Sequence, residues 1–154
     1  NVKFCIINLH GRVFINEDYD CPFRKADEIL AEVSGKSDII IIDFHAEATS
    51  EKAALARYLD GRVTAVFGTH THVQTADERV LRKGTAYITD IGMTGPHDSI
   101  IGMREDEIIE RFMLQTLNKF EVARNDVKLQ GILISLDRKS FKPVKVERIS
   151  SDLK

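Results

Sequence analysis

The sequence lacks the features of several large classes of protein. It contains no tryptophan and only two cysteines, Cys5 and Cys21, among 154 residues. Their spacing is neither a metal-ligand pair nor a disulfide framework, and Cys5 lies in an apolar run typical of a core strand. No signal sequence is evident, and no apolar stretch reaches the roughly 18 residues of a transmembrane helix. We therefore expect a protein of the reducing cytoplasm with no membrane partner.

The chain also lacks an excess of charge of either sign. Lys and Arg number 22 against 24 Asp and Glu, which gives a formal net charge of −2. This balance argues against a basic groove for long nucleic acid, so any nucleotide recognition has to be local. With 43% hydrophobic and 30% charged residues the composition is that of an ordinary globular protein. Its length suits one domain, or one half of a larger one.

The apolar segments alternate between strand and helix patterns. Strands are expected over residues 2–9, 39–44, 63–67 and 85–88, and helices over residues 22–35 and 49–61. Strand, helix and strand in this rhythm predict a parallel sheet.

The C-terminal part of the chain follows a different pattern. After a long loop over residues 90–103 we expect a helix from Arg104 to about Leu117, with its apolar stripe turned inward. That stripe consists of Ile108, Ile109, Phe112 and Met113. Residues 127–136 and 144–149 alternate in polarity and predict two antiparallel strands. The fold class is therefore α/β, with a mixed sheet and antiparallel C-terminal strands.

Histidines follow two of the predicted strands. His45 ends one apolar run, and His70 and His72 follow another within the segment Gly-Thr-His-Thr-His at residues 68–72. Parallel strands end at one edge of a sheet, so these imidazoles can converge on a metal ion. The alternatives are surface histidines, or in the case of His45 a core histidine bonded to a backbone carbonyl.

Other polar residues near these strand ends have candidate roles. Asp43 lies on the same face as His45 and either orients it or binds metal. Asp77 is a candidate acceptor for a metal-bound histidine. Glu47 and Glu51 fit better as loop and helix-start charges.

A glycine-rich loop offers backbone donors to a phosphate. The loop over residues 90–96 either closes over a phosphate or is simply a structural turn. The candidate substrate-binding residues are Thr71, Thr94 and Gly95. His10 and Arg12 lie at another strand end, and His97 is expected to be an exposed loop histidine.

Three motifs in order resemble a known family. Residues 43–52 (DFHAEATSEK), 68–77 (GTHTHVQTAD) and 84–96 (GTAYITDIGMTGP) resemble the YmdB-like metallophosphoesterases. These are bacterial calcineurin-type phosphodiesterases that act on 2′,3′-cyclic nucleotides. The resemblance covers essentially the whole chain.

The resemblance implies a four-layer α/β/β/α sandwich with a dinuclear metal centre. By that resemblance His45 and His70 bind one metal and His72 binds the other. The two ions are divalent or of mixed valence, commonly iron, with manganese or zinc as alternatives. The family's opening motifs, which supply an Asp, a bridging Glu, two Asn residues and a catalytic His, do not occur here. Residues 1–154 are therefore expected to be a single metallophosphoesterase-like domain that lacks its N-terminal portion and contains no catalytic residue.

The expected function is that of a dinuclear metal-dependent phosphodiesterase in the intact protein. It opens a 2′,3′-cyclic nucleotide, or another small phosphodiester, and this chain alone is expected to be inactive. One alternative is a non-catalytic module that keeps the fold and acts through binding or oligomerisation. Another is a mononuclear zinc hydrolase built from the three histidines. The sequence leaves the metal, the physiological substrate and the formation of a homo-oligomer open.

Overall fold

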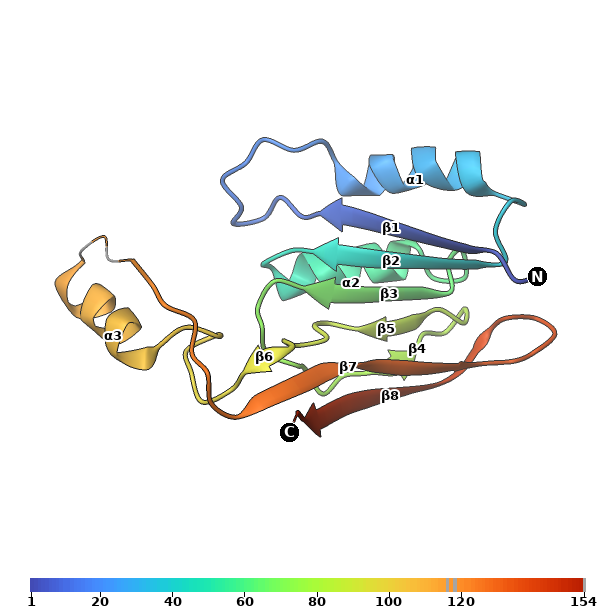
Figure 1. Cartoon of the computed structure of the whole chain (residues 1–154). Coiled ribbons are helices and arrows are strands. Elements are labelled where there is room, and N and C mark those ends of the chain that lie inside the picture. The colour runs from blue at the N-terminus through green and yellow to red at the C-terminus, as the bar shows by residue number, and fades with distance from the viewer. Residues whose placement is uncertain (116, 118, 154) are drawn as a thin grey trace.

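The larger of two sheets, sheet A, is built from strands within residues 4–88. The computed structural model describes residues 1–115, 117 and 119–153 (Figure 1). The strand order of sheet A is β1-β2-β3-β5-β4. These strands are β1 (Phe4–His10), β2 (Ile39–His45), β3 (Ala65–Thr69), β5 (Ala86–Ile88) and β4 (Arg79–Val80). All pair in parallel except β4, which runs antiparallel to β5. The predicted mixed α/β class is confirmed.

Two helices cover one face of sheet A. Helix α1 (Pro22–Val33) begins with Pro22, which has no backbone N–H to leave unpaired in the first turn. Its buried residues Ala26 and Leu30 are four positions apart and therefore lie on one face of the helix. Helix α2 (Thr49–Tyr58) ends before Gly61, whose φ of 83° marks the turn into β3.

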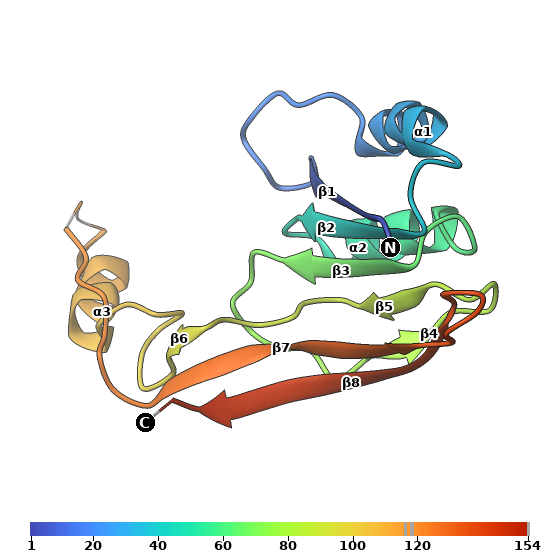
Figure 2. The same ribbon diagram turned by 45° about the vertical axis from the view of Figure 1, so that its right-hand side comes forward.

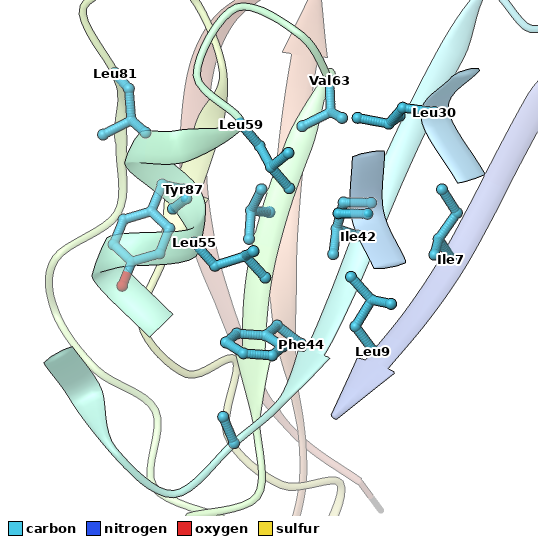
Figure 3. Packing of buried hydrophobic residues seen from close by; sticks show 14 residues of the cluster. Ile7, Leu9, Leu30, Ile42, Phe44, Leu55, Leu59, Val63, Leu81 and Tyr87 are labelled. Atoms are coloured by element: carbon cyan, nitrogen blue, oxygen red, sulfur yellow. The ribbon is translucent and has the colours of Figure 1, made fainter. Parts of the chain in front are cut away.

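The core lies between these helices and sheet A, as Figure 3 shows. Ile42 and Phe44 of β2 are fully buried and lie among the core residues that Figure 3 labels. The cluster comprises Ile7, Leu9, Ala26, Leu30, Ile42, Phe44, Ala46, Leu55, Ala56, Leu59, Val63, Val66, Leu81 and Tyr87. Burial of this apolar surface fixes how α1 and α2 sit on the sheet, and with it the positions of the strand ends.

Sheet B contains the predicted antiparallel strands. It consists of β6 (Gly95–Pro96), β7 (Val127–Leu136) and β8 (Pro143–Asp152). In Figures 1 and 2 it lies at the β4–β5 end of sheet A, where β8 contacts both of those strands. The arrangement of four layers stays a prediction.

Helix α3 (Glu105–Leu114) departs from the prediction in its packing and its end. It stops at Leu114, and Leu117 lies beyond it, while Thr116 and Asn118 fall outside the described residues. The expectation that its apolar stripe faces inward is wrong, because only Ile108 is buried. The exposed fractions are 48% for Ile109, 75% for Phe112 and 77% for Met113. The physical reason is position: α3 lies beyond β6, away from the core of sheet A (Figure 1).

Two further findings concern the cysteines and the length of the helices. Both cysteines are unpaired, and Cys5 packs against the core cluster as predicted. Within the described part of the chain, no helix has the length and apolar character that crossing a membrane requires.

The core and α3 should respond differently to loss of an aromatic ring. We expect Phe44→Ala to lower the free energy of unfolding by about 3–5 kcal/mol, because it leaves a cavity in a packed core. Phe112→Ala is the matched control and should change it by less than about 0.5 kcal/mol, as an exposed substitution does. Urea denaturation of the two variants measures both values. Equal losses would show that the exposed face of α3 is buried in the protein in solution.

Candidate metal centre

The strand register brings the predicted histidine positions to one edge of sheet A. In the parallel pairing His10 is the partner of His45, and His45 is the partner of Thr69. His70 follows Thr69 directly, so the carboxyl ends of β1, β2 and β3 present their polar side chains in one row. The prediction that parallel strand ends bring His45 and His70 together is confirmed.

Two imidazoles face each other closely in this row. Nδ1 of His70 lies 3.0 Å from Nε2 of His45, and the two rings are nearly perpendicular, with centroids 4.8 Å apart. Two nitrogens bound to one metal at about 2.1 Å, at right angles, would stand about 3.0 Å apart. The observed separation therefore suits two ligands of one ion.

Hydrogen bonds determine which nitrogen of His45 carries a proton. Oγ1 of Thr69 donates its one hydroxyl proton to Oδ1 of Asp43 over 2.9 Å, and Asn8 donates to the other carboxylate oxygen. Nδ1 of His45 lies 3.0 Å from the same Thr69 oxygen, which can only accept there. His45 therefore carries its proton on Nδ1, and its Nε2 presents a lone pair to His70.

The carboxylate of Glu47 acts in the same way on the far side of His70. Its Oε2 lies 2.9 Å from Nε2 of His70, which donates a proton to it. In neutral His70 the lone pair is then on Nδ1, facing the lone pair of His45. Two bare nitrogens 3.0 Å apart repel each other unless both interact with one positive charge. This pair either shares a proton or is joined by a cation.

His72 is held by a different partner. Its Nδ1 lies 2.8 Å from the backbone carbonyl oxygen of Ile101, which can only accept, so Nδ1 carries the proton and Nε2 is left bare. A backbone carbonyl is one of the common partners for the second ring nitrogen of a histidine that binds metal. The described contacts of His72 do not include His45 or His70.

Burial and neighbouring imidazoles favour the neutral form of His45. Desolvation lowers the pKa of His45 below 6.5, and the nearby rings of His70 and His10 lower it further against the opposing charge of Asp43. A neutral imidazole is the form that binds a metal ion.

The backbone of the histidine segment is strained. His70 has a φ of 107° and His72 a φ of 64°, values that residues other than glycine seldom adopt. Such strain persists only where the surroundings impose it, and it gathers at functional sites. The segment is therefore not an extended strand end, and a simple alternation of side chains does not describe how these two rings point.

A buried ion pair holds this segment in place. Nζ of Lys52, on α2, lies 2.9 Å from Oδ2 of Asp90, and each side chain is only 1% exposed. The same carboxylate oxygen accepts hydrogen bonds from the backbone N–H and the hydroxyl of Thr71, over 3.1 and 2.8 Å. Its other oxygen accepts from the N–H of Gly92. Asp90 thus joins α2, the histidine segment and the loop after β5.

Gly68 permits this close packing. A Cβ at that position would lie 1.8 Å from the carbonyl oxygen of Thr89 and 2.7 Å from Cδ of Lys52. Any side chain there would separate β3 from the loop that carries Asp90.

The glycine-rich loop is held by contacts within the chain. The N–H of Ile91 donates to Gly68, and the N–H groups of Gly92 and Met93 donate to the side chains of Asp90 and Gln130. These three groups are therefore not available to a phosphate.

The three candidate substrate-binding residues have different surroundings. Thr71 is bonded to Asp90, Thr94 is exposed on the loop, and Gly95 pairs with Lys128 in sheet B. Their role in substrate binding stays a prediction. His97, expected to be exposed, is half-buried, and its Nε2 lies 3.3 Å from the carbonyl oxygen of Met93.

Two residues contact the candidate metal-binding histidines although their sequence context does not indicate it. Glu47, expected to be a loop charge, contacts His70. His10 is recognisable in the sequence only as a strand-end residue, yet its ring lies 5.0 Å from that of His45. The signal for His10 is the parallel register, which aligns it with His45.

Asp77 does not have the predicted contact with a histidine. Its oxygens accept hydrogen bonds from the hydroxyls of Thr75 and Thr89 and from the N–H of Thr89. It braces the start of the Asp90 loop instead.

The donors gathered here do not make a complete metal site. Within residues 1–115, 117 and 119–153, no group of three or more His, Cys, Asp or Glu side chains is arranged to enclose an ion. The chain offers two converging nitrogens and a third bare nitrogen on His72, which fits part of a metal centre.

The sequence matches the YmdB-like protein family over residues 1–149. The chain belongs to this family. It is 55% identical over 147 residues to the 2′,3′-cyclic-nucleotide 2′-phosphodiesterase of Bacillus subtilis strain 168, covering 96% of this chain and 55% of that protein. A putative phosphatase/phosphodiesterase of Mycoplasma pneumoniae is 43% identical over 129 residues, which are 83% of this chain and 45% of the relative. The chain thus spans about half the length of these relatives.

Solved structures of longer proteins share this fold. A hypothetical protein from Thermus thermophilus superposes with a TM-score of 0.90 at 39% identity, covering 97% of this chain and 57% of the other. A crystal structure titled as a novel phosphatase from Mycoplasma pneumoniae gives a TM-score of 0.88 at 39% identity, over 97% of this chain and 53% of that one.

Removal of one partner of the buried ion pair should destabilise the protein strongly. We expect Lys52→Met to lower the free energy of unfolding by about 3–5 kcal/mol, because it leaves the Asp90 carboxylate buried without its cation. Urea denaturation measures this loss. The control is Lys25→Met, which removes an exposed ion pair with Glu28 and should have little effect. Similar midpoints for Lys52→Met and the unmodified protein would contradict the structural role of the pair.

The contribution of Asp77 to stability should depend on pH. Burial raises the pKa of Asp77, but hydrogen bonds from Thr75 and Thr89 and the charge of Arg79 outweigh it, so its pKa lies below 3.8. A lowered pKa stabilises the fold above about pH 4, and that stability is lost as the pH falls through the folded-state pKa. Asp77→Asn should therefore cost about 1 kcal/mol at pH 7 and progressively less below pH 4.

Thermal unfolding of Asp77→Asn across this pH range measures the difference. The exposed residue Asp98 provides the matched variant Asp98→Asn, which should follow the unmodified protein at every pH. A deficit for Asp77→Asn that stays constant with pH would contradict the assignment.

Proposed function

We propose that the intact protein is a metal-dependent phosphodiesterase that opens 2′,3′-cyclic nucleotides at the 2′ oxygen. The observation that carries the proposal is the facing pair of bare nitrogens, Nε2 of His45 and Nδ1 of His70, 3.0 Å apart at the edge of a parallel sheet. The name of the Bacillus subtilis relative, which is 55% identical to this chain, supports the substrate class. The small net charge of −2 suits a small phosphate ester better than a long polyanion.

The metal ligands of this chain are His45, His70 and His72. His45 and His70 would hold one ion through Nε2 and Nδ1, and His72 would hold a second ion through its Nε2. Imidazole ligands accept iron, manganese or zinc, so availability decides which metal is bound. Three nitrogens do not fill two coordination spheres. The remaining donors come from outside this chain. They belong to a part of the intact protein that corresponds to the additional length of the relatives.

The neighbouring residues orient these ligands. Asp43, through Thr69, fixes the proton of His45 on Nδ1, and Glu47 fixes that of His70 on Nε2. A cation bound by both imidazoles would supply positive charge that polarises a phosphoryl oxygen and acidifies a water molecule. The Lys52–Asp90 pair keeps the histidine segment rigid, so the ligands need no rearrangement when the substrate arrives.

The proposed fold of the intact protein is the four-layer sandwich. Phe4 and Ile6 support it, because they alternate with buried residues of β1 and are 62% and 72% exposed. An apolar strand face open to water is the face on which a further layer packs.

A second candidate is a binding module without catalysis. It is favoured by the incomplete donor set among the described residues. Incubation of the intact protein with 2′,3′-cyclic AMP and manganese distinguishes the two functions. Phosphorus NMR then identifies the product. The proposed enzyme forms adenosine 3′-phosphate, whereas a binding module leaves the cyclic ester intact.

Metal loading should depend on His70 and on the hydroxyl of Thr69. His70→Ala is expected to abolish stoichiometric metal and phosphodiesterase turnover in the intact protein. Thr69→Val keeps the shape of the side chain but removes the acceptor for His45, and should weaken metal affinity by about 10–100-fold. The controls His97→Ala and Thr94→Val should retain wild-type metal content. Elemental analysis and a competitive chelator titration provide the measurements, and unchanged stoichiometry in His70→Ala would refute the proposal.

A further inference from the structure

We propose that the loop between β1 and α1 forms a nucleobase subsite beside the candidate metal centre. Phe14 and Tyr19 are its stacking residues, and the ligand is a planar aromatic heterocycle. The inference rests on the proposed function, because it supplies the place for the base of a substrate whose phosphate lies at His45 and His70.

A cavity of suitable size lies between this loop and the histidines. It measures about 260 Å³ and is lined on one side by residues 14–17 and Tyr19, and on the other by His10, His45 and His70. Pockets for drug-sized ligands begin at about 300 Å³, so this cavity suits a single planar ring system. A ligand within it touches the loop and the metal-binding rings at once.

Phe14 is displayed in an unusual way. Its side chain is 83% exposed, and its φ of 64° is in the left-handed region, which a bulky aromatic residue rarely adopts. Packing among the described residues does not explain this conformation, because so much of the ring is exposed. A strained backbone that exposes an aromatic ring at the rim of a cavity is better explained by a ligand.

The loop is fixed by a carboxylate from α2. The oxygens of Glu51, a buried residue, accept hydrogen bonds from the N–H of Arg12 over 3.0 and 3.1 Å and from that of Val13 over 3.2 Å. Gly11 allows this approach, since a Cβ there would lie 2.5 Å from the Glu51 oxygen. The segment directly before Phe14 is therefore rigid, and the ring is held beside the cavity rather than free to move away.

Aromatic rings continue from the loop to the metal-binding histidines. The ring centroid of Tyr19 lies 5.0 Å from that of His10, and His10 lies 5.0 Å from His45. His45 is in turn 4.8 Å from His70. A base placed against these rings gains stacking on more than one wall, which is how proteins bind bases with little dependence on their identity.

The lining also includes groups that can read the edge of a base. Asn16 offers an amide with donors and an acceptor, and Glu17 offers a carboxylate that accepts from exocyclic amines. A larger cavity of about 640 Å³ near the start of α3 also has an amide and carboxylates in its lining, but no ring on which a base can stack. Its described lining is mainly charged, includes Arg104 and Asp106, and contains neither an aromatic residue nor a histidine.

The test separates binding of the base from binding of the phosphate. It uses the metal-loaded intact protein with two substrates, 2′,3′-cyclic AMP and methyl riboside 2′,3′-cyclic phosphate, which has no base. Phe14→Ala should raise KM for 2′,3′-cyclic AMP at least about fivefold, the effect of losing one stacked base. It should leave kcat/KM for the base-free ester unchanged. Phe14→Tyr should restore KM, and Phe112→Ala, an exposed ring on α3, should have no effect.

If Phe14 had only a structural role, Phe14→Ala would reduce turnover of both esters by the same factor, and that result would overturn the inference. Unchanged kinetics for both esters would overturn it as well. Failure of the proposed function looks different, since the unmodified protein would then hydrolyse neither ester. In that case calorimetry of the metal-free protein with 2′,3′-cyclic AMP decides. Weaker binding by Phe14→Ala, again at least about fivefold, supports the subsite. Absent or equal binding rejects it.

Discussion

The buried ion pair between Lys52 and Asp90 is the interaction on which the candidate site depends. Its two side chains are almost completely buried, so each needs the other to offset the loss of hydration. Asp90 uses its remaining acceptor capacity on Thr71, within the histidine segment, and on Gly92, in the loop after β5. Because every partner is satisfied, the network is rigid rather than strained by unpaired charge.

Glu51, the residue before Lys52 in α2, holds a second loop in place. Glu51 receives the N–H groups of the loop after β1, while Lys52 anchors the loop after β3 through Asp90. Consecutive residues of one helix therefore position the aromatic residues on one side and the histidines on the other. A site whose ligands and neighbouring cavity are held by one regular element is preorganised for binding. Phe14, His70 and His72, with their strained φ values, lie in the two loops that are held in this way.

The sequence was sufficient to predict the parallel strands and the meeting of their ends. Continuous apolar runs indicated β2 and β3, and parallel pairing then placed His45 beside His70. The same pattern failed for α3, because helical periodicity identifies an apolar stripe but not whether another element covers it. Phe112 shows this, since its spacing is that of a core residue and its ring is exposed.

The finer features of the site could not be read from the sequence. The tautomer of His45 depends on Thr69 and Asp43, whose distances follow from strand register and not from spacing along the chain. The contact between Glu47 and His70 joins two loops, and loop conformation is set by tertiary contacts such as those of Asp90. His10 was visible as a strand-end histidine, but only the pairing of β1 with β2 places its ring against His45.

The central claim is that one cation is bound by both His45 and His70. Anomalous diffraction from crystals of the intact protein grown with manganese tests it most directly. The account predicts a peak within about 2.0–2.3 Å of both Nε2 of His45 and Nδ1 of His70, the distance of a metal–imidazole bond. A fully occupied manganese peak elsewhere, with the two nitrogens still 3.0 Å apart and no peak within bonding distance of both, would contradict it.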